Sequence, residues 1–254
     1  MLLRRITQHV KAQNWFAVGL DFLIVVVGVF IGIQVSNWNA ARVDQDRALG
    51  YLERINANLD ADIKDIEIRT EFWRKVADYG ATGLAYAETS DASTNSAWEM
   101  VLAYFQASQV AELIPSQATY DELKSAGELG LITNHEIRNA LTNYYLFTAA
   151  PSVTERPPYR EHVRGIIPLN VQQYIWNSCY VSDGTGDQDM RACPSPISGA
   201  RATEIADAIS SDTALMRELR YWMSSMHVAG IIGQSRLDIA TALRVMINEE
   251  ISKS

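Results

Sequence analysis

The sequence predicts an all-α protein in which one N-terminal transmembrane helix continues into an extracytoplasmic helical bundle. Three observations support this prediction. Residues 22–33 contain no charged side chain. Hydroxyl and carboxylate residues occur three times in the middle of the chain at the spacing that starts helices. No stretch alternates β-branched and polar residues for long enough to predict a sheet.

The N-terminal segment has the composition of a membrane-spanning helix. Such a helix needs about 20 mostly apolar residues, and between Trp15 and Ile33 only Asp21 carries a charge. We therefore divide the chain into a cytoplasmic tail at residues 1–14, a transmembrane helix at residues 15–38 and a periplasmic helical-bundle domain at residues 39–254.

Aromatic and amide side chains mark the two ends of this segment. Trp15 and Trp38 are separated by roughly 35 Å at about 1.5 Å of helical rise per residue, which suits indoles in opposite headgroup layers. Amide side chains near Trp38 can contact headgroups and water in the same way. The predicted membrane-interface residues are Trp15, Gln34, Asn37, Trp38 and Asn39.

The charges that flank the segment predict its orientation. Arg4, Arg5 and Lys11 precede it without an acidic neighbour, and only Arg42 and Arg47 follow closely. This bias favours a single-pass protein of the bacterial inner membrane with a cytoplasmic N-terminus and a periplasmic C-terminal domain. A cleaved secretory signal has a similar basic start and apolar core, but only a poor small-residue cleavage site follows it, so we favour an anchor.

Four residues of the segment predict a helix–helix contact. Gly28 and Gly32 form a GxxxG motif that Ser36 continues, and at about 100° per residue Asp21 falls on nearly the same face. A carboxylate is disfavoured by around 3 kcal/mol at the centre of a membrane helix, so Asp21 should face a partner or water. The expected partner is a second copy or another membrane protein. The alternative is a GxxxG spacing that arises by chance.

The chain after the segment continues as a helix with a heptad pattern. Large apolar residues recur every seven positions, and the companion series is more polar. The pattern fits a coiled coil between copies, in which Asn56 fixes the register, or one apolar face of an intramolecular bundle, which we favour because Asn56 and Thr70 weaken half of the seam. The two series are Leu52, Leu59, Ile66 and Trp73, and Leu49, Asn56, Ile63 and Thr70.

Several further helices are predicted along the chain. We expect a helix to end at Gly127 and a new one to begin at Asn134, which makes an αα-hairpin. A helix at residues 159–177, interrupted near residues 165–168, and a long helix at residues 212–251 complete the prediction. The three capping boxes pair Ser96 with Glu99, Thr119 with Glu122, and Thr133 with Glu136.

The two cysteines lie in a predicted loop at residues 178–199. Cys179 and Cys193 have no CxxC spacing and no neighbouring histidine pair, so we predict a disulfide formed in an oxidising compartment, with free thiols in a reducing cytosol as the alternative. Acidic residues at 183–189 alternate as in a calcium loop. The segment lacks the glycine and the closing glutamate of such a loop, so we predict no metal.

Composition and motifs argue against nucleic-acid binding and catalysis. The net charge is −8 and no concentrated basic face is evident, so nucleic acid is not an expected partner. The sequence contains no phosphate loop, no GxSxG and no HExxH. The four histidines are scattered along the chain. We therefore expect a protein that is not an enzyme and uses no cofactor.

Two blocks of the sequence resemble a family of uncharacterised bacterial single-span membrane proteins. In that family a Gln-x-x-Asn-Trp-Asn motif closes the N-terminal helix, as in "GIQVSNWN" here, and "TYDELKSAGELGLITNHEIRNALTNYY" is similar to its mid-chain pattern. The acid at Asp21 is more often glutamate in the family. The resemblance implies a helical extracytoplasmic domain and supplies no activity. The matching residues are Asp21, Gln34, Asn37, Trp38, Asn39, Tyr120, Leu123, Gly127, Asn134, Arg138, Tyr144 and Tyr145.

The sequence therefore favours a non-enzymatic, membrane-anchored protein whose periplasmic helical domain binds a partner or self-assembles. One alternative is a proton-coupled, energy-transducing subunit in which Asp21 takes up and releases a proton. The energisers of that class have α/β periplasmic domains, whereas this chain is predicted to be all-α. Another alternative is a periplasmic bundle that senses a ligand.

Overall fold

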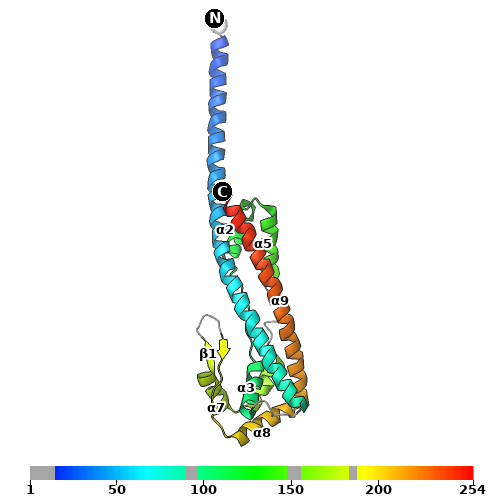
Figure 1. Ribbon diagram of the computed structural model, residues 1–254. Helices are drawn as coiled ribbons and strands as arrows, with labels where there is room; N and C mark the ends of the chain where they lie inside the picture. Colours follow the sequence, from blue (N-terminus) through cyan, green and yellow to red (C-terminus); the bar gives the residue numbers. More distant parts are fainter. Residues whose placement is uncertain (1–14, 90–95, 148–155, 183–187, 254) are drawn as a thin grey trace, which may run out of the picture. The chain divides into compact units, whose positions relative to one another are not determined.

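The computed structural model describes residues 15–89, 96–147, 156–182 and 188–253. These residues are helical with very few in strands, so the all-α prediction is confirmed. The chain divides into two compact units, one that ends at Tyr51 and one that spans Leu52–Ser254. The helix α2 (Trp15–Thr89) contributes residues to both units (Figure 1).

In the first unit, α2 is a helix whose apolar side chains face outward. It has the length and composition to cross a membrane, and none of its most apolar window is buried. From Leu20 to Trp38, every large apolar side chain has between 45% and 71% of its surface exposed. A helix of a soluble core would bury such side chains against other elements.

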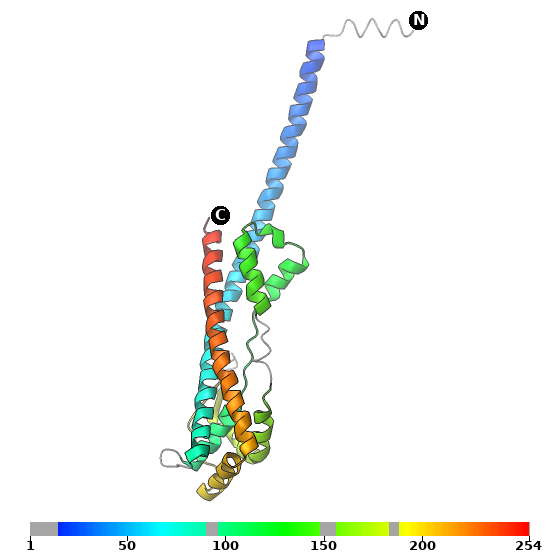
Figure 2. The same cartoon turned by 90° about the vertical axis from the view of Figure 1, so that its right-hand side faces the viewer.

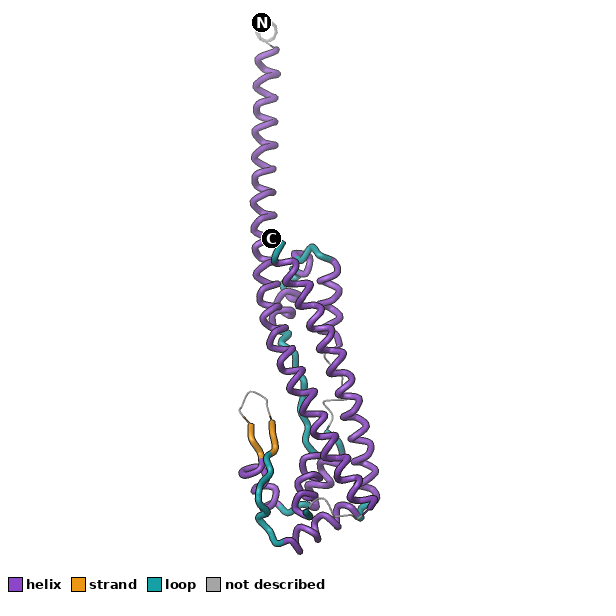
Figure 3. The backbone as a smooth tube through the Cα atoms, viewed as in Figure 1, coloured by secondary structure: helices purple, strands orange, loops and turns teal. Residues whose placement is uncertain are grey.

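The second unit contains the remaining part of α2 and all later elements (Figure 3). Short helices and one pair of short strands come first, and one long helix comes last. They are α3 (Ala97–Ala107), α4 (Ala118–Ser125), η1 (Leu129–Leu131), α5 (His135–Phe147), α6 (Pro158–Ile166), α7 (Leu169–Tyr174), η3 (Ile175–Cys179), β1 (Tyr180–Ser182), β2 (Gln188–Met190), α8 (Gly199–Ser210) and α9 (Thr213–Ile251).

Within the second unit, α2 and α9 pair in an antiparallel orientation (Figure 2). Asn56 donates a hydrogen bond of 3.0 Å to Asn248, and Arg220 forms an ion pair of 3.3 Å with Glu88. The residue numbers of the contacts increase along α2 as they decrease along α9, so the two helices run antiparallel. A Cβ atom added at Gly233 would collide with Thr70 and lie 3.3 Å from the Trp73 ring, so the missing side chain permits this close approach.

The first heptad series forms part of the core of this unit. Leu52, Leu59, Ile66 and Trp73 are each at most 3% exposed. The companion series is half-buried, and Asn56 bonds within the chain. In the described residues the first series therefore packs within one chain, whereas the choice between a bundle face and a coiled coil between copies stays a prediction.

One predicted capping box is confirmed and two are wrong. The Ser96 amide donates to Glu99, and the Glu99 amide donates back to Ser96 Oγ. Thr119 does not cap, because α4 begins one residue before it and its hydroxyl accepts a hydrogen bond of 2.9 Å from Asn58. The packing of α4 against α2 therefore overrides the local capping pattern.

At α5 the cap is Asn134 in place of Thr133. The Asn134 side-chain oxygen accepts hydrogen bonds from the amides of Glu136 and Ile137, which satisfies two orphan donors of the first turn. The predicted start of the helix was correct. Gly127 has φ = +72° after α4, a left-handed conformation that glycine adopts without a steric penalty, so the predicted turn is also correct.

The segment from residue 158 to residue 199 is more structured than predicted. The interrupted helix is confirmed as α6 and α7, and α7 continues through one π turn to Cys179. The predicted loop contains a small antiparallel pair, with Tyr180 opposite Met190. Three residues per strand give too short an alternation to detect in a sequence.

Candidate functional site

The four residues predicted to form a helix contact lie along α2 within the first unit. Asp21, Gly28, Gly32 and Ser36 are all exposed, and a Cβ atom added at either glycine would meet nothing within 4 Å. Helical geometry places them on one face. Among the described residues, nothing therefore covers this face at the two glycines.

The predicted membrane-interface residues also lie on α2. Trp38 is 67% exposed, and Gln34, Asn37 and Asn39 are exposed around it. Trp15 begins the helix, and its side chain lies outside the described residues. The amide and indole groups thus follow directly after the apolar run that the helix presents to its surroundings.

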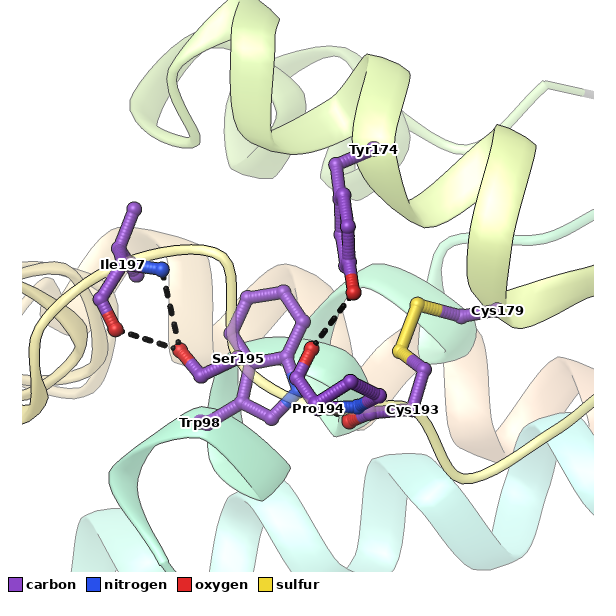
Figure 4. Close-up of a disulfide and its surroundings, with 7 residues drawn as sticks. All are labelled: Trp98, Tyr174, Cys179, Cys193, Pro194, Ser195 and Ile197. Atoms are coloured by element: carbon purple, nitrogen blue, oxygen red, sulfur yellow. Dashed lines mark hydrogen bonds between the residues drawn. A yellow bond between two sulfur atoms is a disulfide. The ribbon is translucent and has the colours of Figure 1, made fainter.

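In the second unit, Cys179 and Cys193 form a disulfide with their Cα atoms 5.3 Å apart (Figure 4). The disulfide joins the end of η3 to the segment that follows β2. The Arg191 amide donates to the Cys179 carbonyl at 2.8 Å, which continues the pairing of the two strands toward the disulfide.

Two aromatic side chains hold the segment after Cys193 in place. The Trp98 indole donates a hydrogen bond of 2.9 Å to the Cys193 carbonyl, and the Tyr174 hydroxyl donates one of 2.9 Å to the Pro194 carbonyl (Figure 4). The rings of Trp98 and Tyr174 also meet edge to face at 6.3 Å. The segment is therefore fixed to α3 and α7 by hydrogen bonds as well as by the disulfide.

This anchored segment forms the wall of an apolar hollow of about 380 Å³. The first half of α3, with Trp98 and Leu102, and Ala202 of α8 also line it. The capping box places Glu99 at the rim. A hollow of this size and lining fits one or two apolar side chains or a small ligand.

A second hollow shares lining residues with the first, and a third shares lining residues with the second. A hollow of about 300 Å³ shares Glu99, Leu102 and Ala192 with it and adds Arg191. A third, of about 280 Å³, shares Tyr79 and Thr82 with the second and adds further α2 residues. We refer to these three hollows together as the disulfide groove. It is lined by Lys75, Asp78, Tyr79 and Thr82 of α2, by residues 96–100, 102 and 103 at the start of α3, by loop residues 191–195, and by Gly199 and Ala202 of α8.

The disulfide groove changes character along its length. The end beside the disulfide is apolar, with Trp98, Leu102 and Pro194, whereas the end on α2 presents Lys75 and Asp78. An occupant with an apolar part and a polar or charged part would match both ends. Sequence reasoning did not find this surface, because it depends on how α2, α3 and the loop pack together.

A buried polar network lies apart from the groove. Asp62 is 3% exposed and accepts hydrogen bonds from the Tyr144 hydroxyl at 2.7 Å and from the Ser116 amide at 2.8 Å. Burial raises the pKa of Tyr144 well above its usual range, and the carboxylate of Asp62 raises it further. The network joins α2, α5 and the segment before α4, so its contacts are those of a structural support.

No group of three or more His, Cys, Asp or Glu residues that could hold a metal ion occurs in the ranges that the structure describes. The sequence that resembles a calcium loop has its residues 183–187 outside those ranges. His162 lies 2.8 Å from Glu218 on the surface, and His135 contacts Arg138. His9 lies outside the described residues.

The residues of the mid-chain family pattern cluster on α4 and α5. Tyr120 and Tyr145 stack with ring centroids 4.4 Å apart, and Arg138 donates to the Ile132 carbonyl in the turn between the helices. These contacts give the pattern a role in packing the hairpin. Comparison with known proteins finds no matching family model, no matching curated protein and no matching solved structure.

Proposed function

We propose that this chain is a non-enzymatic protein of the bacterial inner membrane, anchored by residues 15–38, whose periplasmic helical bundle binds a partner in the disulfide groove. The observation that carries the proposal is the exposed apolar run on α2 from Leu20 to Trp38. We further propose that the chain belongs with the single-span family that it resembles, on the strength of the Gln-x-x-Asn-Trp-Asn motif.

The exposed run supports a membrane anchor on energetic grounds. Removing one Val, Leu, Ile or Phe side chain from water contributes about 1.5–3 kcal/mol. The run contains many such side chains, each at least 45% exposed. Insertion in a bilayer removes all of these side chains from water at once. A helix can insert in this way because its backbone N–H and C=O groups are hydrogen-bonded to one another.

The disulfide and the flanking charges support a periplasmic location for the second unit. Disulfides persist in oxidising compartments such as the periplasm. Arg4, Arg5 and Lys11 precede the apolar run, which fits a cytoplasmic N-terminus. Both arguments assign the same side of the membrane to Cys179 and Cys193.

The disulfide groove supports partner binding. Its apolar end is walled by a segment that a disulfide and two hydrogen bonds hold in place, so little ordering is required when a partner binds. Its other end is lined by Lys75 and by Asp78, which forms an ion pair with Arg74. The occupant that fits is an extended segment of another envelope protein, with an apolar side chain beside Trp98 and polar groups toward α2.

Site-specific photocrosslinking in cells tests this proposal. A photoreactive residue at Ala192, which is exposed and lines two of the hollows, should give one discrete adduct with a protein other than this chain. Ala192→Trp fills the groove and should abolish adducts from a photoreactive residue at Thr82. Ala126→Trp, at an exposed alanine outside the groove, is the matched control and should leave them unchanged.

The outcomes separate the possible occupants. An adduct with a second copy would assign the groove to self-assembly, and the absence of any adduct that Ala192→Trp removes would contradict partner binding there. Alkylation of Cys179 and Cys193 in intact cells without prior reduction would contradict the periplasmic disulfide.

A further inference from the structure

Two arginines of α6 lie side by side against the end of α3. Arg160 donates hydrogen bonds of 2.6 Å to the Ser108 carbonyl and 3.5 Å to Gln109 Oε1. Arg164 donates 3.0 Å to Ser108 Oγ and 3.2 Å to the same Gln109 oxygen. The Arg164 guanidinium also lies over the Phe105 ring at 4.7 Å. Both guanidinium groups are thus fixed in position.

No carboxylate pairs with either arginine among the described residues. The end of α3 contributes only about half a negative charge, whereas the two guanidinium groups carry two positive charges. Burial, followed by the charge of Arg160, lowers the pKa of Arg164 to about 10, and the pKa of Arg160 is lowered by burial and by Arg156. The described residues therefore supply no carboxylate counter-charge to the cluster.

Gln109 supplies an additional, independent donor. Its side chain is 2% exposed, and its Nε2 has no hydrogen-bond partner among the described residues. The amide orientation is determined by the arginines, because they can only donate and therefore require the oxygen. An unpaired amide donor in a buried position is destabilising. The Gln109 Nε2 atom therefore lies within a cationic cluster and can donate a hydrogen bond to an acceptor that binds there.

We propose that Arg160, Arg164 and Gln109 bind a phosphate group. Each guanidinium has five N–H donors, and the contacts above leave several of them available on both arginines. Phosphate is a dianion with several acceptor oxygens, so it balances both cations and accepts from the Gln109 amide at once. The group belongs to a soluble phosphorylated ligand or to an anionic lipid headgroup. This site is separate from the disulfide groove and does not depend on its function.

Thermal unfolding of the full chain in an uncharged detergent tests the site. Inorganic phosphate should raise the midpoint by a few degrees in a saturable way, compared with sodium chloride at equal ionic strength. In the second arm, the midpoint is measured with short-chain phosphatidylglycerol and compared with the midpoint in short-chain phosphatidylcholine. A rise with inorganic phosphate assigns a soluble ligand, and a rise with phosphatidylglycerol alone assigns a lipid headgroup.

Gln109→Glu is the most specific variant. It places a carboxylate against both arginines, so it should raise the midpoint in phosphate-free buffer and abolish the response to phosphate. Gln106→Glu is the matched control, because Gln106 is equally buried at 2% exposure but bonds to no described arginine. That variant should lower the midpoint. Arg164→Lys keeps the charge but loses the planar fork, and should weaken phosphate binding at least tenfold.

The proposal is overturned if neither phosphate nor phosphatidylglycerol raises the midpoint above the matched control salt or lipid. It is also overturned if Gln109→Glu destabilises the protein as much as Gln106→Glu does, because the arginines would then already be neutralised. Glu155 lies outside the described residues, and Glu155→Gln identifies that case. A phosphate response that appears only in this variant would show that the chain supplies its own counter-charge.

Discussion

His162 and Glu218 form a surface pair that reports on the contact between α6 and α9. The hydrogen bond from His162 to Glu218, 2.8 Å long, raises the pKa of the histidine, and the charges of Glu218, Glu161 and Asp212 raise it further. The folded-state pKa lies above the unfolded value of 6.5, so the stability that the pair contributes is fully present below that pH. It is lost as the pH rises through the raised pKa.

NMR titration of the histidine side chains checks this prediction. His162 should titrate above pH 6.5, and Glu218→Gln should lower its pKa toward the ordinary value. A His162 pKa that does not respond to Glu218→Gln would contradict the pairing.

At the residue scale, the sequence identified side chains whose role depends on local chemistry. Ser96 and Glu99 form the predicted cap, and Gly127 adopts the predicted left-handed turn. It could not identify Asp62 as buried, or Arg164 as having no carboxylate partner among the described residues. Both features arise from elements far apart in the sequence, and a single charged residue in a helical pattern normally lies on a solvated face.

At the element scale, the approach of α9 to α2 depends on Gly233. Gly233→Ala should destabilise the second unit, because the added methyl group would collide with Thr70 and press on Trp73, which is 1% exposed. The expected loss is about 1–3 kcal/mol in the free energy of unfolding. Gly230→Ala, three residues earlier in the same helix with nothing within 4 Å of the added atom, should instead stabilise by up to about 1 kcal/mol.

Chemical denaturation of the two variants provides the measurement. The predicted result is a change of opposite sign for two identical substitutions within one turn of α9. Equal effects for both would mean that α9 does not approach α2 at Gly233.

The disulfide links α7 and η3 to the wall of the groove. The sequence separation of its cysteines is 14, and closing a loop of that size in the unfolded chain corresponds to about 3 kcal/mol of stability. Replacing both Cys179 and Cys193 with serine should lower the free energy of unfolding by about that amount. Reductant should lower the free energy of unfolding of the wild type by the same amount. It should leave that of the double serine variant unchanged. A wild type that is insensitive to reductant would contradict the prediction.

The open face of α2 makes a separate prediction about association. Replacing Gly28 and Gly32 with isoleucine fills the small-residue surface that a second helix would approach. Self-association of the span in a membrane reporter assay should fall severalfold. Val27→Ile and Ile31→Val keep the glycines and form the control pair. Unchanged association in the glycine variant would remove this face as a contact.

Helices were predicted more accurately than the surface that they form together. The heptad series from Leu52 to Trp73 and the long helix α9 follow from the 3.6-residue period, which is a local property. The strand pair after Cys179 was missed because each strand has three residues. The disulfide groove was missed because its walls come from α2, α3 and a loop, and a single sequence does not contain the distances between them.

At the scale of the whole molecule, the proposed function requires two environments for one chain. Under the proposal the apolar residues of α2 lie in lipid, whereas the unit at Leu52–Ser254 has its own buried core. The sequence indicated this division through the contrast between residues 22–33, which have no charge, and the mixed charges that follow. That contrast does not identify the partner, because recognition depends on the shape of the folded surface.

Membrane fractionation of cells that express the intact chain tests the central claim most directly. After washing with sodium carbonate at high pH, which strips peripheral proteins, the full-length protein should remain in the membrane pellet and be released only by detergent. Recovery of the intact, uncleaved chain in the carbonate supernatant would contradict a membrane-spanning α2.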